Sequence, residues 1–209
     1  MAAYTFYTNP MSRGQIARWA LHEAGADYDQ VLVDWADKPA AFAAVNPMGK
    51  VPAIVHHTAS GNRVITECAA ICAYLADAHP EAGLLPSAAE RADYYRWMFF
   101  AAGPVEQAIV GKSMGWEVPA GREGMAGFGS LARVLDTLEG HFSANEYVCG
   151  MRFTMADVYV GSQIDWGLNF GSIPARGAFA AYAERLRNRP AYSAAKTIDT
   201  ALIAASQTD

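Results

Sequence analysis

Short β-prone runs alternate with helical patterns over the first eighty residues. Strands are predicted at Tyr4–Tyr7, Gln30–Asp34, Val51–His56 and Arg63–Thr66, and helices at residues 12–24, Pro39–Val45 and Cys68–Ala78. The predicted order is therefore βαβαββα. Two strand–helix–strand units favour parallel pairing in at least part of the sheet. A turn at Ser60-Gly61-Asn62 favours an antiparallel hairpin between the last two strands.

The strand signals stop after Pro80, and every later periodic segment is helical. Residues 81–87 carry the features of a linker, so we expect one domain over residues 1–80 and an all-helical domain over 88–209. Pro104 lies inside the first apolar stripe of the helical part and should kink that helix. Further helices are predicted around Leu131–Phe142, from Thr154, over Ala175–Leu186 and over Ala191–Ala205.

Composition and charge favour a cytoplasmic protein. The chain has 209 residues, of which 52% are apolar and 18% charged, and a net charge of −5 argues against nucleic acid and anionic membranes as partners. No apolar run reaches the roughly 20 residues that span a bilayer, and the N-terminus lacks the features of a secretory signal. Cys68, Cys72 and Cys149 form no CxxC motif, which indicates neither a disulfide framework nor a redox pair.

One proline stands where a strand should begin. The stretch NPMGKVPAIV, residues 46–55, places Pro52 at the entrance of the third predicted strand, where it cannot donate a backbone hydrogen bond. A trans proline at a strand entrance is the common form. A cis Val51–Pro52 bond would instead leave the Val51 N–H and C=O facing outward, where an extended peptide could pair with them.

This stretch and ITECAAICAYLAD, Ile65–Asp77, resemble the glutathione-binding half of the cytosolic glutathione transferases. FTMADVYV, Phe153–Val160, and NRPAYSAAK, Asn188–Lys196, follow in the order expected for the helical half of that family. The resemblance covers nearly the whole chain. It implies a thioredoxin-like α/β domain with a cis Pro52, followed by an all-α domain. It also implies a detoxifying, homodimeric glutathione transferase that uses glutathione as co-substrate and no metal.

The resemblance assigns residues to the γ-glutamyl end of glutathione. Glu67 would bind its ammonium group, and the free N–H groups at the start of the next helix would bind its carboxylate. Cys68 stands where the family usually has serine or threonine, and a thiol is a weaker donor than a hydroxyl. Alternatively, Cys68 is only a small buried side chain stacked on Cys72.

The same resemblance places the rest of the tripeptide. Val51, held by the cis Pro52, would bind the backbone of the cysteinyl residue through its own N–H and C=O. Lys50 is the first candidate for the glycine carboxylate, and Lys38 is the second. Without the resemblance, either lysine would be interpreted as an exposed surface charge.

Three residues could activate the glutathione thiol. Ser12 lies where the serine-type, theta- and beta-like enzymes of the family have their hydrogen-bond donor, and Asn9 and Tyr7 are its rivals. Lowering a thiol pKa from about 8.5 to about 6.5 requires roughly 2.7 kcal/mol. A hydrogen bond to a charged group supplies about 1.5–3 kcal/mol, and a helix N-terminus about 0.3–1 kcal/mol. Alternatively, Ser12 and Gln15 form a capping box.

The electrophile should bind an apolar surface. The candidate walls are Met11, Trp35, Phe100, Met114, Trp116, Trp166 and Phe170. Met11, Met114 and Trp116, which flank loops, are favoured over Phe100 and Trp166, because an aromatic stripe on a helix is more typical of a core. Farther along, Thr154 and Asp157 predict a second capping box, a structural role.

Two classes of function remain open on sequence alone. The first is glutathione conjugation, and a glutathione-dependent dehalogenase, isomerase or peroxidase would use the same glutathione site. The second is a non-catalytic binding or interaction protein with the same fold. The first class is favoured by the presence of Ser12, Lys50, Val51-Pro52 and Glu67. Cys68 is the feature that favours the second.

Overall fold

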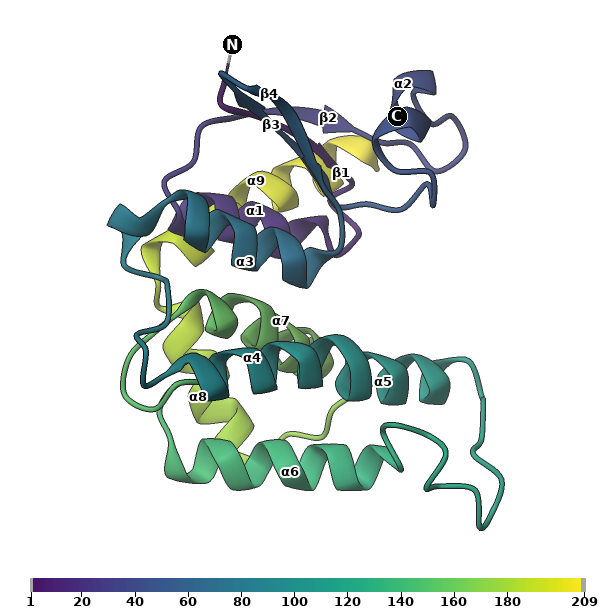
Figure 1. Ribbon diagram of the computed structural model, residues 1–209. Coiled ribbons are helices and arrows are strands. Elements are labelled where there is room, and N and C mark those ends of the chain that lie inside the picture. The colour runs from purple at the N-terminus through teal and green to yellow at the C-terminus, as the bar shows by residue number, and fades with distance from the viewer. Residues whose placement is uncertain (1, 208–209) are drawn as a thin grey trace. The chain divides into compact units, whose positions relative to one another are not determined.

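The computed structural model describes residues 2–207 and divides the chain into two compact units (Figure 1). One unit contains the chain up to Leu85 together with the segment from Asn188 onward, and the other is Pro86–Arg187. The first unit carries the sheet, and the second is helical. No helix within residues 2–207 is both long and apolar enough to cross a membrane.

The first unit is built on a single sheet with the strand order β2-β1-β3-β4. Its strands are β1 (Tyr4–Thr8), β2 (Tyr28–Leu32), β3 (Ala53–Thr58) and β4 (Gly61–Ile65). Its helices are α1 (Gly14–Glu23), α2 (Ala40–Val45), α3 (Cys68–Ala78) and α9 (Pro190–Ser206). The predicted βαβαββα order and the α/β fold class are therefore confirmed.

The sheet is mixed, with one parallel and two antiparallel pairs of strands. β1 pairs with β2 in parallel, but β1 and β3 are antiparallel, so β2 and β3 run in opposite directions. The prediction of parallel pairing in at least part of the sheet is therefore confirmed, although β2 and β3, the strands of the second strand–helix–strand unit, are not neighbours. The hairpin between β3 and β4 is confirmed, although its turn comes earlier than expected. Thr58 pairs with Gly61, which leaves Ala59 and Ser60 as the turn residues.

The two faces of β1 are covered by different helices. Tyr4, Phe6 and Thr8 are fully buried on one face, on which α1 and α3 pack (Figure 1). Tyr7 points to the other face, where its ring stacks on Phe42 of α2 at a centroid distance of 5.3 Å. The alternation of large side chains along one short strand thus fixes a helix layer on each side of the sheet.

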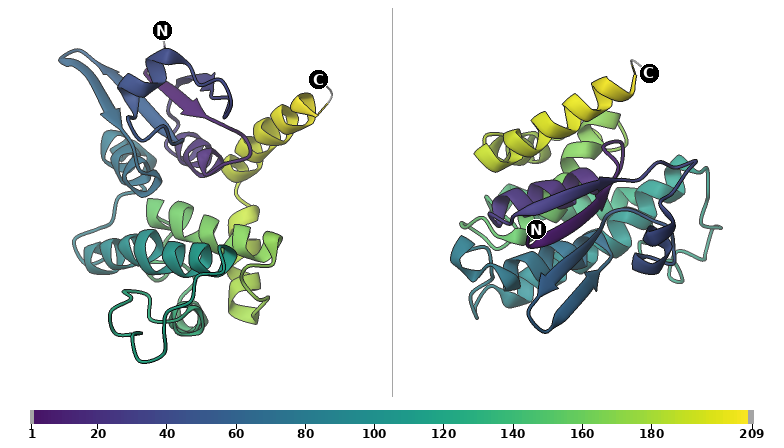
Figure 2. Two further views of the ribbon diagram at one scale, coloured as in Figure 1. Left: turned by 90° about the vertical axis from the view of Figure 1, so that its right-hand side faces the viewer. Right: turned by 90° about the horizontal axis from the view of Figure 1, so that it is seen from above.

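The last helix belongs to the sheet-containing unit, although sequence order had grouped it with residues 88–209. α9 packs along α1 (Figures 1 and 2). The Arg18 Nε atom lies 2.9 Å from Asp199 Oδ1, and both side chains are buried. Arg189 donates two hydrogen bonds, of 2.6 and 2.7 Å, to the Glu23 carboxylate. These charged pairs join helices that are far apart in the sequence.

The second unit consists of five α-helices joined by loops and one bulge. They are α4 (Arg91–Phe100), α5 (Glu106–Ser113), α6 (Leu131–Ala144), α7 (Met155–Phe170) and α8 (Gly177–Arg187). A π-helical segment, Ala101–Val105, joins α4 to α5 and contains Pro104. The predicted distortion is thus present. It takes the form of a π-bulge because proline cannot donate the regular helical hydrogen bond.

Asp157 fixes the start of α7, the most buried helix of this unit. Its carboxylate accepts hydrogen bonds from Thr154 N–H at 2.8 Å, Val148 N–H at 2.7 Å and the Tyr182 hydroxyl at 2.8 Å. The predicted capping box with Thr154 is confirmed. Burial raises the pKa of Asp157 to about 6, although the hydrogen bonds donated to the carboxylate oppose that shift.

We predict that Asp157→Asn lowers the stability of the protein by about 2–3 kcal/mol. The asparagine amide replaces one carboxylate oxygen, an acceptor, by an NH2 group, a donor. That donor would face the N–H or O–H donors that now bind the Asp157 carboxylate. Because about 1 kcal/mol shifts the melting temperature of a chain of this size by roughly 2–4 °C, thermal unfolding should show the loss clearly. Asp136→Asn, at a position 68% exposed, is the matched control and should melt like the wild type. Equal melting of both variants would contradict this role of Asp157.

Candidate active site

Several chain segments leave the sheet at the same end. The β1–β3 ladder ends at the pair Tyr7–Ala53, so the turn after β1 and the residues before Ala53 lie at that end. The β3–β4 ladder ends there too, at Ile54–Ile65. The chain beyond Ile65 therefore emerges at the same end as Pro52. The register of the sheet alone brings together the segments that contain Ser12, Val51 and Glu67.

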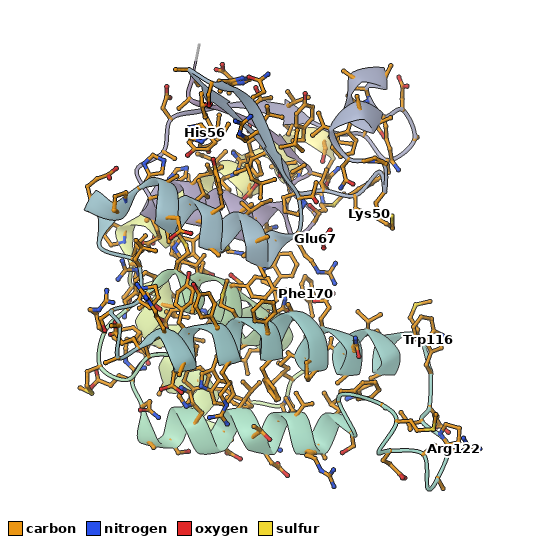
Figure 3. The ribbon with its side chains drawn as sticks, in the orientation of Figure 1. Lys50, His56, Glu67, Trp116, Arg122 and Phe170 are labelled. Carbon is orange, nitrogen blue, oxygen red and sulfur yellow. The ribbon has the colours of Figure 1, made fainter. Side chains whose placement is uncertain are left out.

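Glu67 has the unusual backbone of this region. Its φ is 62° and its ψ 115°, and within residues 2–207 it is the only non-glycine residue with a positive φ. Such a conformation costs on the order of 1–3 kcal/mol and is typically retained at functional sites. The Glu67 side chain is exposed, and its carboxylate has no hydrogen bond or ion pair to any described residue (Figure 3). It is therefore free to bind a cationic group.

Cys68 begins α3 directly after Glu67. Its side chain is only 8% exposed, and its Sγ lies 3.7 Å from the Arg13 carbonyl oxygen, to which the thiol donates. The thiol therefore links the start of α3 to the start of α1. No side chain caps α3, so a bound carboxylate could accept hydrogen bonds from the N–H groups of its first turn.

Val51 lies just before the sheet. The Val51–Pro52 peptide bond is cis, as predicted. Among residues 2–207, the Val51 backbone N–H and C=O have no hydrogen-bond partner. Because backbone polar groups in folded proteins are normally paired, this position can bind the backbone of an extended ligand.

Two lysines meet beside Val51. Lys50 is exposed, and the Lys38 Nζ lies 3.3 Å from the position that a Cβ on Gly49 would occupy. Neither ammonium group forms an ion pair with a described residue. The Asn46 side chain holds the loop by donating a 2.7 Å hydrogen bond to the Lys50 carbonyl. The sequence ranked Lys38 behind Lys50, whereas the structure brings both to the same loop.

Ser12 lies in the turn between β1 and α1. Its hydroxyl donates to the Asn9 carbonyl at 2.7 Å and accepts from Gly14 N–H at 2.9 Å. A hydroxyl has one hydrogen, so donation to a bound sulfur requires that hydrogen to turn away from Asn9. The Asn9 carbonyl would still accept from Ser12 N–H, at 3.1 Å. Rotation of the Ser12 hydroxyl therefore does not leave the Asn9 carbonyl without a hydrogen-bond donor.

The alternative capping box at Ser12 is wrong. The residue before α1 is Arg13, and the Ser12 hydroxyl accepts from Gly14 N–H rather than from Gln15 N–H. The Gln15 side chain does not return to Ser12 but donates to the Pro10 carbonyl. The helix begins two residues later than the sequence suggested, which places Ser12 in the turn itself.

Both rivals of Ser12 have structural contacts. The Asn9 side chain accepts from Met11 N–H at 2.9 Å and donates to the Val33 carbonyl at 3.0 Å, so it ties the turn to the chain after β2. Tyr7 packs on α2. Ser12 thus has a hydroxyl that can exchange its partner without breaking a contact between elements.

Gly14 is a residue of the candidate site that the sequence analysis did not single out. A Cβ at this position would lie 2.0 Å from Thr8 Oγ1 and 3.0 Å from Ser12 Oγ. Glycine therefore lets the start of α1 approach the end of β1 closely enough to hold Ser12 in place. The only sequence signal was a glycine directly at a strand–helix junction, and glycine is common at such junctions whether or not they form a site.

We predict that Gly14→Ala destabilises the protein by about 2 kcal/mol or more, because the added methyl group meets buried Thr8 at the strand end. Chemical denaturation monitored by circular dichroism measures this loss. Gly140→Ala is a matched control, because Gly140 lies inside α6 with open space around its Cα, and it should stabilise by about 0.5–1 kcal/mol. If Gly14→Ala is as stable as the wild type, the turn can move to accommodate the methyl group, and the close approach of α1 to β1 does not require glycine.

The apolar candidates are exposed in both units. Met11 and Trp35, in the first unit, are 63% and 48% exposed. In the second unit, Trp116 lines a cavity of about 500 Å³ together with Val110, Val118 and other residues of α5 and the loop that follows it. Met114, which directly follows α5, is 60% exposed and does not line this cavity.

The other three aromatic candidates differ in exposure. Phe170 is 79% exposed at the end of α7 (Figure 3). Phe100 and Trp166 are half-buried.

Comparison with known proteins identifies the class to which this fold belongs. The family model for the glutathione S-transferase N-terminal domain matches residues 11–78, and the model for the C-terminal domain matches residues 118–190. Glutathione S-transferase 3 of Zea mays is 31% identical over 170 residues, which cover 75% of each chain. The chain therefore belongs to the cytosolic glutathione transferase superfamily.

Solved structures agree with this assignment. A glutathione transferase of Methylococcus capsulatus is similar with a TM-score of 0.77 and 30% identity, over 94% of this chain and 98% of that one. A sphingomonad glutathione S-transferase complexed with glutathione has a TM-score of 0.74 and 29% identity over the same shares. The predicted fold, an α/β unit followed by helices, is thus the fold of this family.

Proposed function

We propose that this protein is a glutathione transferase of the serine type, which ionises the glutathione thiol through Ser12 and directs it at a small apolar electrophile. The observation that carries the proposal is Glu67, an exposed carboxylate without a partner on a strained backbone at the start of α3. A fold has no structural reason to maintain that strain at an unpaired charge, whereas a binding site does.

The polar groups of the candidate site match glutathione from end to end. Glu67 binds the ammonium of the γ-glutamyl end, and the first N–H groups of α3 bind the neighbouring carboxylate. The N–H and C=O of Val51 pair with the cysteinyl backbone, as in the addition of a strand. Lys38 and Lys50 bind the glycine carboxylate with their ammonium groups. In this arrangement each charged group of the tripeptide has a partner of opposite charge or an N–H donor.

The chemistry follows from the position of the sulfur beside Ser12. The thiol loses its proton to solvent, and the Ser12 hydroxyl turns from Asn9 to donate to the thiolate. The thiolate then forms a bond with an electrophilic carbon, whose leaving group departs with the bonding electrons. Because nucleophilicity falls as the pKa falls, a moderate decrease in pKa serves the reaction better than complete stabilisation of the thiolate. Met11, beside Ser12 and 63% exposed, offers an apolar surface to the electrophile.

We predict that Ser12→Ala raises the apparent pKa of bound glutathione by about 1–2, because one charge-assisted hydrogen bond is lost. The value of kcat/KM should fall by about tenfold near pH 6.5 and by much less near pH 9, where the thiol ionises without help. A pH titration of thiolate absorbance and of the rate with chlorodinitrobenzene measures both effects. Ser60→Ala, in the exposed β3–β4 turn, is the control. An unchanged titration in Ser12→Ala would assign activation to Asn9 or Tyr7.

We predict that Glu67→Gln weakens glutathione binding by about 10- to 100-fold, because the ammonium loses its charged partner. Its melting temperature should stay near the wild-type value, since the Glu67 carboxylate has no partner in the fold. Calorimetric titration with glutathione measures the affinity, and Glu184→Gln, an exposed position on α8, is the matched control. If Glu67→Gln binds glutathione as tightly as the wild type, this carboxylate does not belong to the site.

The same measurements separate conjugation from a non-catalytic role. A binding or interaction protein of this fold would bind immobilised glutathione without turning over any electrophile. Turnover that falls in Ser12→Ala while binding persists supports the enzyme. Binding without turnover, over a panel of electrophiles, would support the second class.

A further inference from the structure

A single amide side chain connects the C-terminal helix to the turn that holds Ser12. Gln15, in the first turn of α1, donates from its Nε2 to the Pro10 carbonyl. Its Oε1 accepts a 2.6 Å hydrogen bond from the Nζ of Lys196 on α9. Pro10 lies between Asn9 and Ser12, so the contact reaches the centre of the turn. Gln15 and Lys196 are 181 positions apart in the sequence, and their hydrogen bond lies next to the turn that contains Ser12.

The two hydrogen bonds of Gln15 reinforce each other. A cation at the amide oxygen draws electron density from the nitrogen, which makes the N–H a stronger donor to Pro10. Lys196 is itself held in place, because its Nζ lies 5.5 Å from the centroid of the Tyr192 ring and the side chain is half-buried. The charge of Lys196 therefore acts on the turn through Gln15.

α9 does not need Lys196 in order to stay on α1. The buried pair of Arg18 and Asp199 and the two hydrogen bonds from Arg189 to Glu23 already anchor it. Lys196 also interacts electrostatically with Asp199, but the direct charged pairs that anchor α9 are those of Arg18 and Arg189. Removing its ammonium should therefore disturb the turn and leave the helix docked.

We propose that Lys196 and Gln15 are positioning residues, which hold the turn of residues 9–12 so that Ser12 faces the glutathione sulfur. Activation of glutathione then depends on a residue of the C-terminal helix that does not touch the substrate. This inference rests on the proposed function. It deepens that function by assigning to α9 a role in the chemical step.

The test is Lys196→Met, which keeps the alkyl stem and removes the charge and the donor. The apparent pKa of bound glutathione should rise by about 0.5, which corresponds to a roughly threefold lower kcat/KM near pH 6.5 and little change near pH 9. The KM for glutathione should stay within about twofold, because the groups that bind the tripeptide are untouched. Gln15→Leu should show the same pH shift, and the double variant no more than Gln15→Leu alone.

Two further variants distinguish positioning from general stability. Lys196→Arg retains a cationic donor and should keep the wild-type pH profile. Arg189→Met removes an anchor of α9 without touching Gln15, so it should lower the melting temperature and leave the pH profile unchanged. If Lys196→Met behaves like Arg189→Met, the role of Lys196 is merely structural and the proposal is overturned.

A second measurement does not depend on glutathione. Hydrogen–deuterium exchange at the backbone amides of residues 11–14 should be faster in Lys196→Met than in the wild type, because the turn is held less firmly. Unchanged exchange together with an unchanged pH profile overturns the proposal. If the wild-type protein does not bind glutathione at all, the proposed function fails, whereas the exchange measurement still decides whether Lys196 positions the turn.

Discussion

A buried arginine holds the sheet-containing unit together. The Arg18 guanidinium is fully buried, donates to Asp199 of α9 and to the Tyr28 hydroxyl of β2, and lies over the Phe6 ring of β1. One side chain of α1 thus contacts two strands and the last helix. Loss of either partner would leave an uncompensated buried charge, typically at a cost of about 3–5 kcal/mol. The position of α1, and with it the turn that precedes this helix, depends on that pair.

The candidate site and the scaffold differ in how their polar groups are paired. Around the turn, Asn9, Ser12 and Gln15 have every major hydrogen-bonding group engaged, which makes the turn rigid. By contrast, Glu67 and the backbone of Val51 have no partner within the described chain. Paired groups fix the geometry, and unpaired groups remain available to a ligand. Ser12 combines the two properties, because its hydroxyl is hydrogen-bonded in the turn and can still donate to a different acceptor.

Much of the fold could be predicted because its signals are local. The order of strands and helices, the distortion at Pro104 and the capping box at Asp157 all follow from residue type and spacing over a few positions. The cis bond before Pro52 does not follow from spacing, and only the resemblance to a known family implied it. The direction of β3 could not be predicted in this way. A strand–helix–strand pattern fits parallel pairing only when its strands are neighbours, and here β1 lies between β2 and β3.

The sequence by itself determined which candidate groups are present: the acid at Glu67, the lysines at positions 38 and 50, and the serine before α1. Only the tertiary structure decided how they are used. It placed Lys38 beside Gly49 and directed the Cys68 thiol to the Arg13 carbonyl. It also docked α9 on α1, which brought Lys196 to Gln15. The physical reason is that residue type sets what a group can donate or accept, whereas its partner is set by packing between segments that local spacing does not relate.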